Sequence, residues 1–176
     1  MRVLAPTALI CLLLYIVLHE FGHVIVLWSV GANVTEFSIV NAHVMYDGGE
    51  WTNLSDRWMH LNGALLPIIV SLIYMLFYRP AVKNRFYRTF SALFALIPIG
   101  SLLAWVGIPF LYVNGNAPAN DDVTKFLYNF TSQYPALWVS VASLLLMAFC
   151  LFVAIRKGIF RNFYAVIREI RHGDEA

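Results

Sequence analysis

Four stretches of the chain are long enough and apolar enough to cross a lipid bilayer, and no other feature limits the possible folds as strongly. About 20 apolar residues span the hydrocarbon core as a helix, and a helix satisfies its backbone polar groups without water. The chain as a whole is 60% hydrophobic and 12% charged over 176 residues, which is too apolar for an ordinary soluble domain. We therefore predict an all-α polytopic membrane protein, a single domain over 1–176, with about four transmembrane helices at 3–30, 58–78, 90–113 and 135–155.

The segments outside these runs predict two smaller elements. From about residue 33 to 53, β-branched and aromatic residues alternate with polar ones, and Asp47-Gly48-Gly49 is typical of a turn. This pattern predicts a short β-hairpin at the membrane surface after the first helix. The tail at 156–176 is basic and has one apolar face, so it either lies on the bilayer surface or forms a solvated helix.

The basic residues predict how the helices are oriented. Four Lys or Arg residues fall within 79–88, and more follow in the tail. Lys and Arg in short loops are retained on the cytoplasmic side, so we expect this loop, the tail and both chain termini to be cytoplasmic. The hairpin and the loop at 114–122 then share the opposite face. The net charge of +2 is too small to indicate a nucleic-acid partner.

A polar cluster, His19-Glu20-Phe21-Gly22-His23, interrupts the first apolar run near its end. Two histidines four residues apart lie on one helix face and can hold one metal ion, and Glu20 between them suits a general base. Such groups are costly in hydrocarbon and persist mainly where they pair, bind a metal or line a polar cavity. We predict one zinc ion per chain, because zinc accepts imidazole ligands and leaves a position for water. A hydrogen-bonded cluster without metal is the alternative.

A third protein ligand must come from elsewhere in the chain. Asp121 and Asp122 are the acidic residues of the loop before the last apolar run, on the same predicted membrane face as the histidine pair. Adjacent carboxylates at a helix start also favour an N-cap, so we expect one to bind the metal and the other to cap or support. His43 and His60 are competing ligand candidates, although a polar surface or interfacial position fits each of them better.

These motifs resemble the site-2 protease family of intramembrane zinc metalloproteases, the M50 peptidases. The resemblance begins with HEFGH and the following GANVTEFSIV, continues in LNGALLPIIVSL at 61–72, and includes APANDDVTKFL at 117–127. It implies His19 and His23 as zinc ligands, Glu20 as the general base and a distal aspartate as the third ligand. Alignment on the common Asp-Gly form selects Asp121, whereas a compact M50B-like subgroup, in which small and apolar residues follow the aspartate, selects Asp122. We favour Asp122.

The resemblance implies an enzyme that hydrolyses peptide bonds of transmembrane or membrane-tethered substrates with a zinc-activated water. Asn62 is a further candidate for orienting the substrate or the oxyanion. One alternative is a catalytically inactive relative that binds client proteins. A metal transporter is less favoured, because the third and fourth apolar runs contain few polar residues.

The basic loops and the family resemblance imply opposite membrane sides for the zinc. The family carries its zinc toward the cytoplasm, whereas the basic loops here predict the opposite face. Both orientations stay open at this point, and the sequence specifies neither the substrate nor the oligomeric state.

Overall fold

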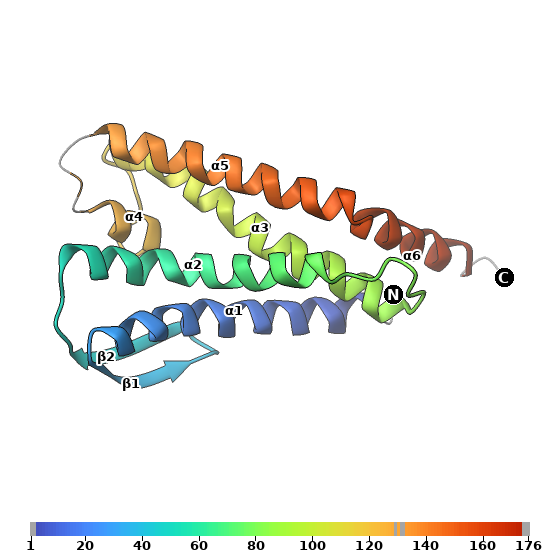
Figure 1. The fold of residues 1–176 in the computed structure, drawn as a ribbon, viewed down its shortest axis with the longest axis horizontal. Helices are drawn as coiled ribbons and strands as arrows, with labels where there is room; N and C mark the ends of the chain where they lie inside the picture. The colour runs from blue at the N-terminus through green and yellow to red at the C-terminus, as the bar shows by residue number, and fades with distance from the viewer. Residues whose placement is uncertain (1–2, 129, 131–132, 174–176) are drawn as a thin grey trace.

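The described part of the chain folds into four long helices, two shorter helices and one small sheet (Figure 1). The structure is a computed structural model that describes residues 3–128, 130 and 133–173. The long helices are α1 (Leu4–Ser29), α2 (Asn53–Leu76), α3 (Arg85–Val113) and α5 (Gln133–Arg156). Four helices are long and apolar enough to cross a membrane, which confirms the predicted helical class and the number of long apolar helices. Their ends differ from the predicted ends by at most five residues.

Predicted and observed helix ends differ most at the starts of α2 and α3, where polar residues form the first turn. Thr52 caps α2: its hydroxyl accepts from the backbone N–H of Ser55, and the Ser55 hydroxyl accepts from the N–H of Thr52. Asn84 caps α3 by accepting from the N–H of Tyr87. An apolar run does not reveal such turns, so both predicted starts were too late.

The long helices run back and forth, so the loops gather at two ends of the bundle (Figure 1). The start of α1, the loop between α2 and α3, and the end of the chain lie at one end. The hairpin and the short helix α4 (Asp122–Leu127) lie toward the other end. This arrangement brings the end of α1 close to α4, although the two are far apart in the sequence.

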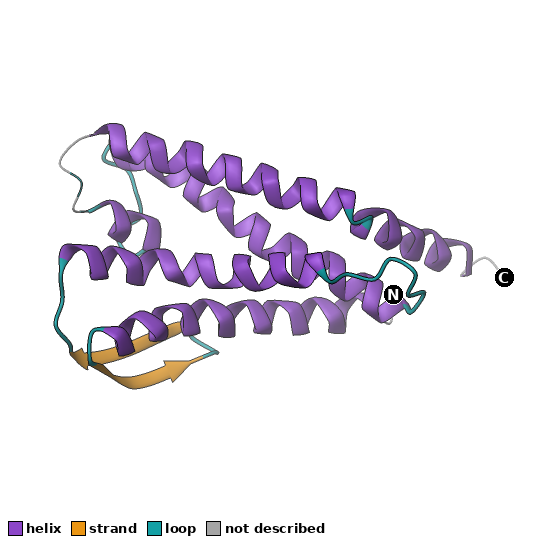
Figure 2. Cartoon of the chain, viewed as in Figure 1, coloured by secondary structure: helices purple, strands orange, loops and turns teal. Residues whose placement is uncertain are grey.

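The only sheet among the described residues is an antiparallel hairpin of β1 (Ala32–Ser38) and β2 (His43–Gly48) (Figure 2). The hairpin was predicted, but its turn was not: the chain reverses at 39–42, while Asp47-Gly48-Gly49 ends β2 and leads toward α2. The hairpin folds back along the second half of α1 (Figure 1). Val34 and Val44 pack there against a cluster that contains Leu27.

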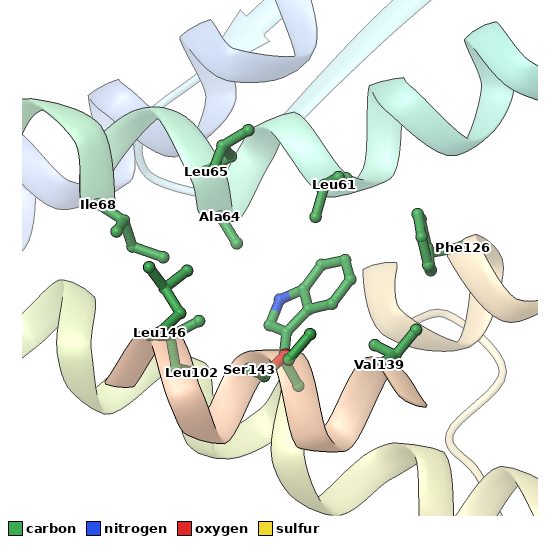
Figure 3. A pocket seen from close by; sticks show the side chains of 11 residues that line it. Leu61, Ala64, Leu65, Ile68, Leu102, Phe126, Val139, Ser143 and Leu146 are labelled. Carbon is green, nitrogen blue, oxygen red and sulfur yellow. The ribbon is translucent and has the colours of Figure 1, made fainter. Parts of the chain in front are cut away.

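The core between α2, α3, α4 and α5 holds α4 in place and encloses an apolar cavity (Figure 3). The cavity has a volume of about 230 Å³, and Leu61 and Ile68 of α2, Trp105 of α3 and Phe126 of α4 are among the side chains that line it. Val123 and Leu127 of α4 are fully buried in the same core. These apolar contacts fix the short helix that carries Asp122.

The tail forms α6 (Ile159–Gly173), whose apolar face packs on the protein itself. Ile159 is fully buried in a cluster with Met75 and Ala92, and Phe163 packs against this cluster. Glu169 adds an exposed ion pair with Arg85, at 2.9 Å. The amphipathic helix was predicted, and its first turns pack on the protein, chiefly against α3 and the end of α2.

Candidate metal centre

Three predicted side chains converge where α1, α2 and α4 meet. Nε2 of His19 lies 3.1 Å from Oδ2 of Asp122, and Nε2 of His23 lies 3.3 Å from the same oxygen. The two Nε2 atoms are 3.2 Å apart. His19, His23 and Asp122 thus form a group of donor atoms that could hold one metal ion, although 103 residues separate His19 from Asp122.

The triangle of donor atoms has the size that a tetrahedral zinc site requires. With Zn–N and Zn–O distances of about 2.0–2.1 Å, neighbouring ligand atoms of a tetrahedron lie about 3.3 Å apart. The three edges of 3.1, 3.2 and 3.3 Å are close to this value. The residues present therefore fit a zinc ion that keeps a fourth position open.

The protonation of His23 also fits a metal ligand. Its Nδ1–H donates to the backbone carbonyl of Met59 at 2.8 Å. In a neutral ring this leaves a lone pair on Nε2, directed at the other two donor atoms. Without a metal, a single proton on Nε2 of His19 would have to be shared between Nε2 of His23 and Oδ2 of Asp122. Nδ1 of His19 would still be buried with no partner among the described residues.

The carboxylate of Asp122 is ionised in this environment. Burial opposes its charge, but the close contacts with the rings of His19, His23 and His60 outweigh that effect and hold the pKa of the carboxyl well below its usual range. His60 reaches the second oxygen, with Nδ1 at 3.1 Å from Oδ1. An ionised carboxylate is the form that binds a metal.

Asp121 occupies a different position from its neighbour. Its side chain caps α4 by accepting from the N–H of Val123 at 2.8 Å. It lines the same cavity as the donor atoms but does not belong to the group of three. The structure thus separates the pair into one residue that faces the histidines and one that starts the helix.

Close contact between α1 and α2 holds the histidines in place. Gly22 lies against the backbone of Asn62, and a Cβ atom on Gly63 would lie 2.6 Å from the His23 ring. The Asn62 amide donates to the carbonyl of Gly22 at 2.7 Å. Asn62 was a candidate for orienting the substrate, but here its amide joins the two helices.

The donor atoms open into a polar cavity of about 360 Å³ that also contains Glu20. Glu20 is buried, with 3% of its surface exposed. Ala42, His43 and Val44 of the hairpin line the cavity, as does Lys125 of α4. His43 pairs with Glu36 at 3.2 Å and is not one of the three grouped residues.

Two groups contribute in ways that the sequence did not predict. His60, a competing ligand candidate, is buried, with 8% exposed, and contacts Asp122, so the expectation of a polar surface position was wrong. The Met59 carbonyl has no signature in the sequence at all. The position of His60 three residues before Gly63, and so on the same helix face, was the one available sign that it faces α1.

Comparison of the chain with protein-family models, curated proteins and solved structures finds no match. The site must therefore be interpreted from its own geometry and chemistry.

Proposed function

We propose that the protein is an intramembrane zinc metalloprotease, similar in its motifs to the site-2 protease family. The observation that carries the proposal is the donor triangle of His19, His23 and Asp122, whose edges of 3.1 to 3.3 Å suit one zinc ion. Glu20, buried on the same helix and in the same cavity, supports a hydrolytic reaction over a purely structural metal site, because structural zinc sites are closed by four protein ligands.

In this proposal the long helices α1, α2, α3 and α5 cross the bilayer. Among the described residues, every Lys and Arg except Arg57 and Lys125 lies in 79–88 or from Arg156 onward. The acidic residues Glu36, Asp47, Glu50 and Asp56 lie at the opposite end. This distribution favours cytoplasmic chain termini, with the metal centre nearer the other face of the membrane.

Each side chain of the site then has a defined task. Zinc, when bound, supplies a Lewis acid that polarises the scissile carbonyl and lowers the pKa of a coordinated water. His19, His23 and Asp122 hold the ion. Glu20 accepts a proton from the attacking water and returns it to the departing amine.

The hairpin supports a substrate that is held in extended form. A helix hides its carbonyls in its own hydrogen bonds, so a transmembrane substrate must unwind before cleavage. The sheet has two strands, which leaves one edge of each unpaired within the sheet, and β2 lines the catalytic cavity with His43 and Val44. An unwound segment would pair with such an edge.

The test is cleavage of a co-expressed single-span reporter with an epitope tag on each side of its transmembrane segment. We expect wild type to yield two tagged fragments and Glu20→Gln to yield none, while both proteins contain one zinc ion. A client-binding protein without activity would instead capture the reporter equally well in both forms and never cleave it. That result would refute the protease proposal.

A further inference from the structure

His60 gives the two oxygens of Asp122 different partners. Oδ2 lies within 3.3 Å of Nε2 of both His19 and His23, whereas Oδ1 lies 3.1 Å from Nδ1 of His60. A carboxylate that binds a metal is deprotonated and only accepts hydrogen bonds, so Nδ1 of His60 must carry the proton of this 3.1 Å contact. Each carboxylate oxygen of Asp122 therefore has its own partners: Oδ2 faces the histidine pair of α1, and Oδ1 accepts from His60.

His60 is itself held away from the centre of the site. It belongs to α2, directly after Met59, whose carbonyl orients His23. Its ring centroid lies 6.4 Å from that of His23, and it is not among the donor atoms that lie within 4.8 Å of one another. Nε2 faces Asp56, one turn earlier in α2, at 3.9 Å, which is beyond hydrogen-bond distance.

We propose that His60 is a positioning residue: its Nδ1–H holds Oδ1 of Asp122, so that the carboxylate presents only Oδ2 to the metal and a fourth position stays open. A carboxylate free at both oxygens can bind a metal through both. That mode would occupy the position which a hydrolytic zinc site needs for water. Hydrogen bonds to ligating carboxylates are a general means of fixing metal ligands.

The inference rests on the proposed zinc site, and one pair of amide substitutions tests it separately. In His60→Asn the side-chain NH2 takes the place of Nδ1, whereas in His60→Gln the NH2 extends to the place of Nε2. The two variants are similarly polar, and only the first keeps a donor near Oδ1. His43→Gln is the matched control, because His43 lines the same cavity but pairs with Glu36.

Zinc affinity of the purified full chain, measured by competition with a chelator, is the first readout. We expect His60→Asn and His43→Gln to bind zinc within about threefold of wild type, and His60→Gln to bind about 10–100-fold more weakly. Equal affinity in wild type and His60→Gln, or equal weakening in both His60 variants, would overturn the inference. If wild type itself binds no zinc, the proposed function fails first.

The visible spectrum of the cobalt-substituted protein is the second readout. Four-coordinate cobalt absorbs more strongly than five- or six-coordinate cobalt. We expect a four-coordinate spectrum for wild type and His60→Asn, and a weaker, higher-coordinate spectrum for His60→Gln. An unchanged spectrum in His60→Gln would show that His60 does not determine how Asp122 binds, even if the zinc site itself is correct.

Discussion

Gly63 leaves the space that the two histidine rings occupy. A Cβ atom there would lie 2.6 Å from Nε2 of His23 and 3.0 Å from Cε1 of His19. Since ligand atoms must stay about 2.0–2.1 Å from zinc, the rings cannot move aside and still coordinate. We predict that Gly63→Ala weakens zinc binding at least about tenfold, as measured by zinc content after dialysis against a chelator.

Gly100 is the control for this substitution. It also lies inside a long helix, but apart from the adjacent backbone of that helix nothing lies within 4 Å of the Cβ that alanine would add. Alanine should therefore leave zinc binding unchanged and stabilise α3 by up to about 1 kcal/mol. If Gly63→Ala retains zinc as well as Gly100→Ala does, the rings do not depend on Gly63 for their position.

At the scale of elements, α2 organises the site more than any other helix. Met59 orients His23, His60 contacts Asp122, and Asn62 joins α2 to α1 through the carbonyl of Gly22. A hydrogen bond between helices in a membrane contributes about 0.6 kcal/mol on average and at most about 1.7 kcal/mol. We predict that Asn62→Ala lowers the free energy of unfolding in mixed micelles by about 0.6 kcal/mol, and by no more than about 1.7 kcal/mol.

Zinc binding by Asn62→Ala shows whether the lost hydrogen bond also positions the metal ligands. Because Asn62 donates to Gly22, between the two histidines, the same variant should weaken zinc binding. A variant that loses stability but binds zinc like wild type would show that the contact holds α1 and α2 together without positioning the ligands.

The sequence predicts some elements of the site better than others. The spacing of His19 and His23 places both on one face of α1 because helical geometry is local. Asp122 was found because it follows a long loop on the same predicted membrane face, but spacing alone did not separate it from Asp121. His60 and the Met59 carbonyl act through the packing of α2 on α1 and α4. The only local sign of that contact is Gly63, three residues after His60. The hairpin turn was misplaced because the glycines at 48 and 49 are a stronger turn signal than the residues at 39–42.

At the scale of the whole molecule, the charge distribution predicts the orientation in the membrane. Asn116, in the loop after α3, and Ala81, in the loop after α2, are both exposed, and native Cys11 and Cys150 are buried. We predict that a membrane-impermeant maleimide labels Asn116→Cys on intact cells and labels Ala81→Cys only after permeabilisation. The reverse result would place the metal centre toward the cytoplasm, as the family resemblance implies.

The most direct test of the central claim is the zinc content of the purified protein, measured for wild type beside Asp122→Ala and Asp121→Ala. We predict about one zinc ion per chain in wild type and in Asp121→Ala, which loses only a helix cap of about 1 kcal/mol, and almost none in Asp122→Ala. Wild-type protein without zinc, or Asp122→Ala with the full wild-type content, would contradict a metal centre formed by α1 and α4.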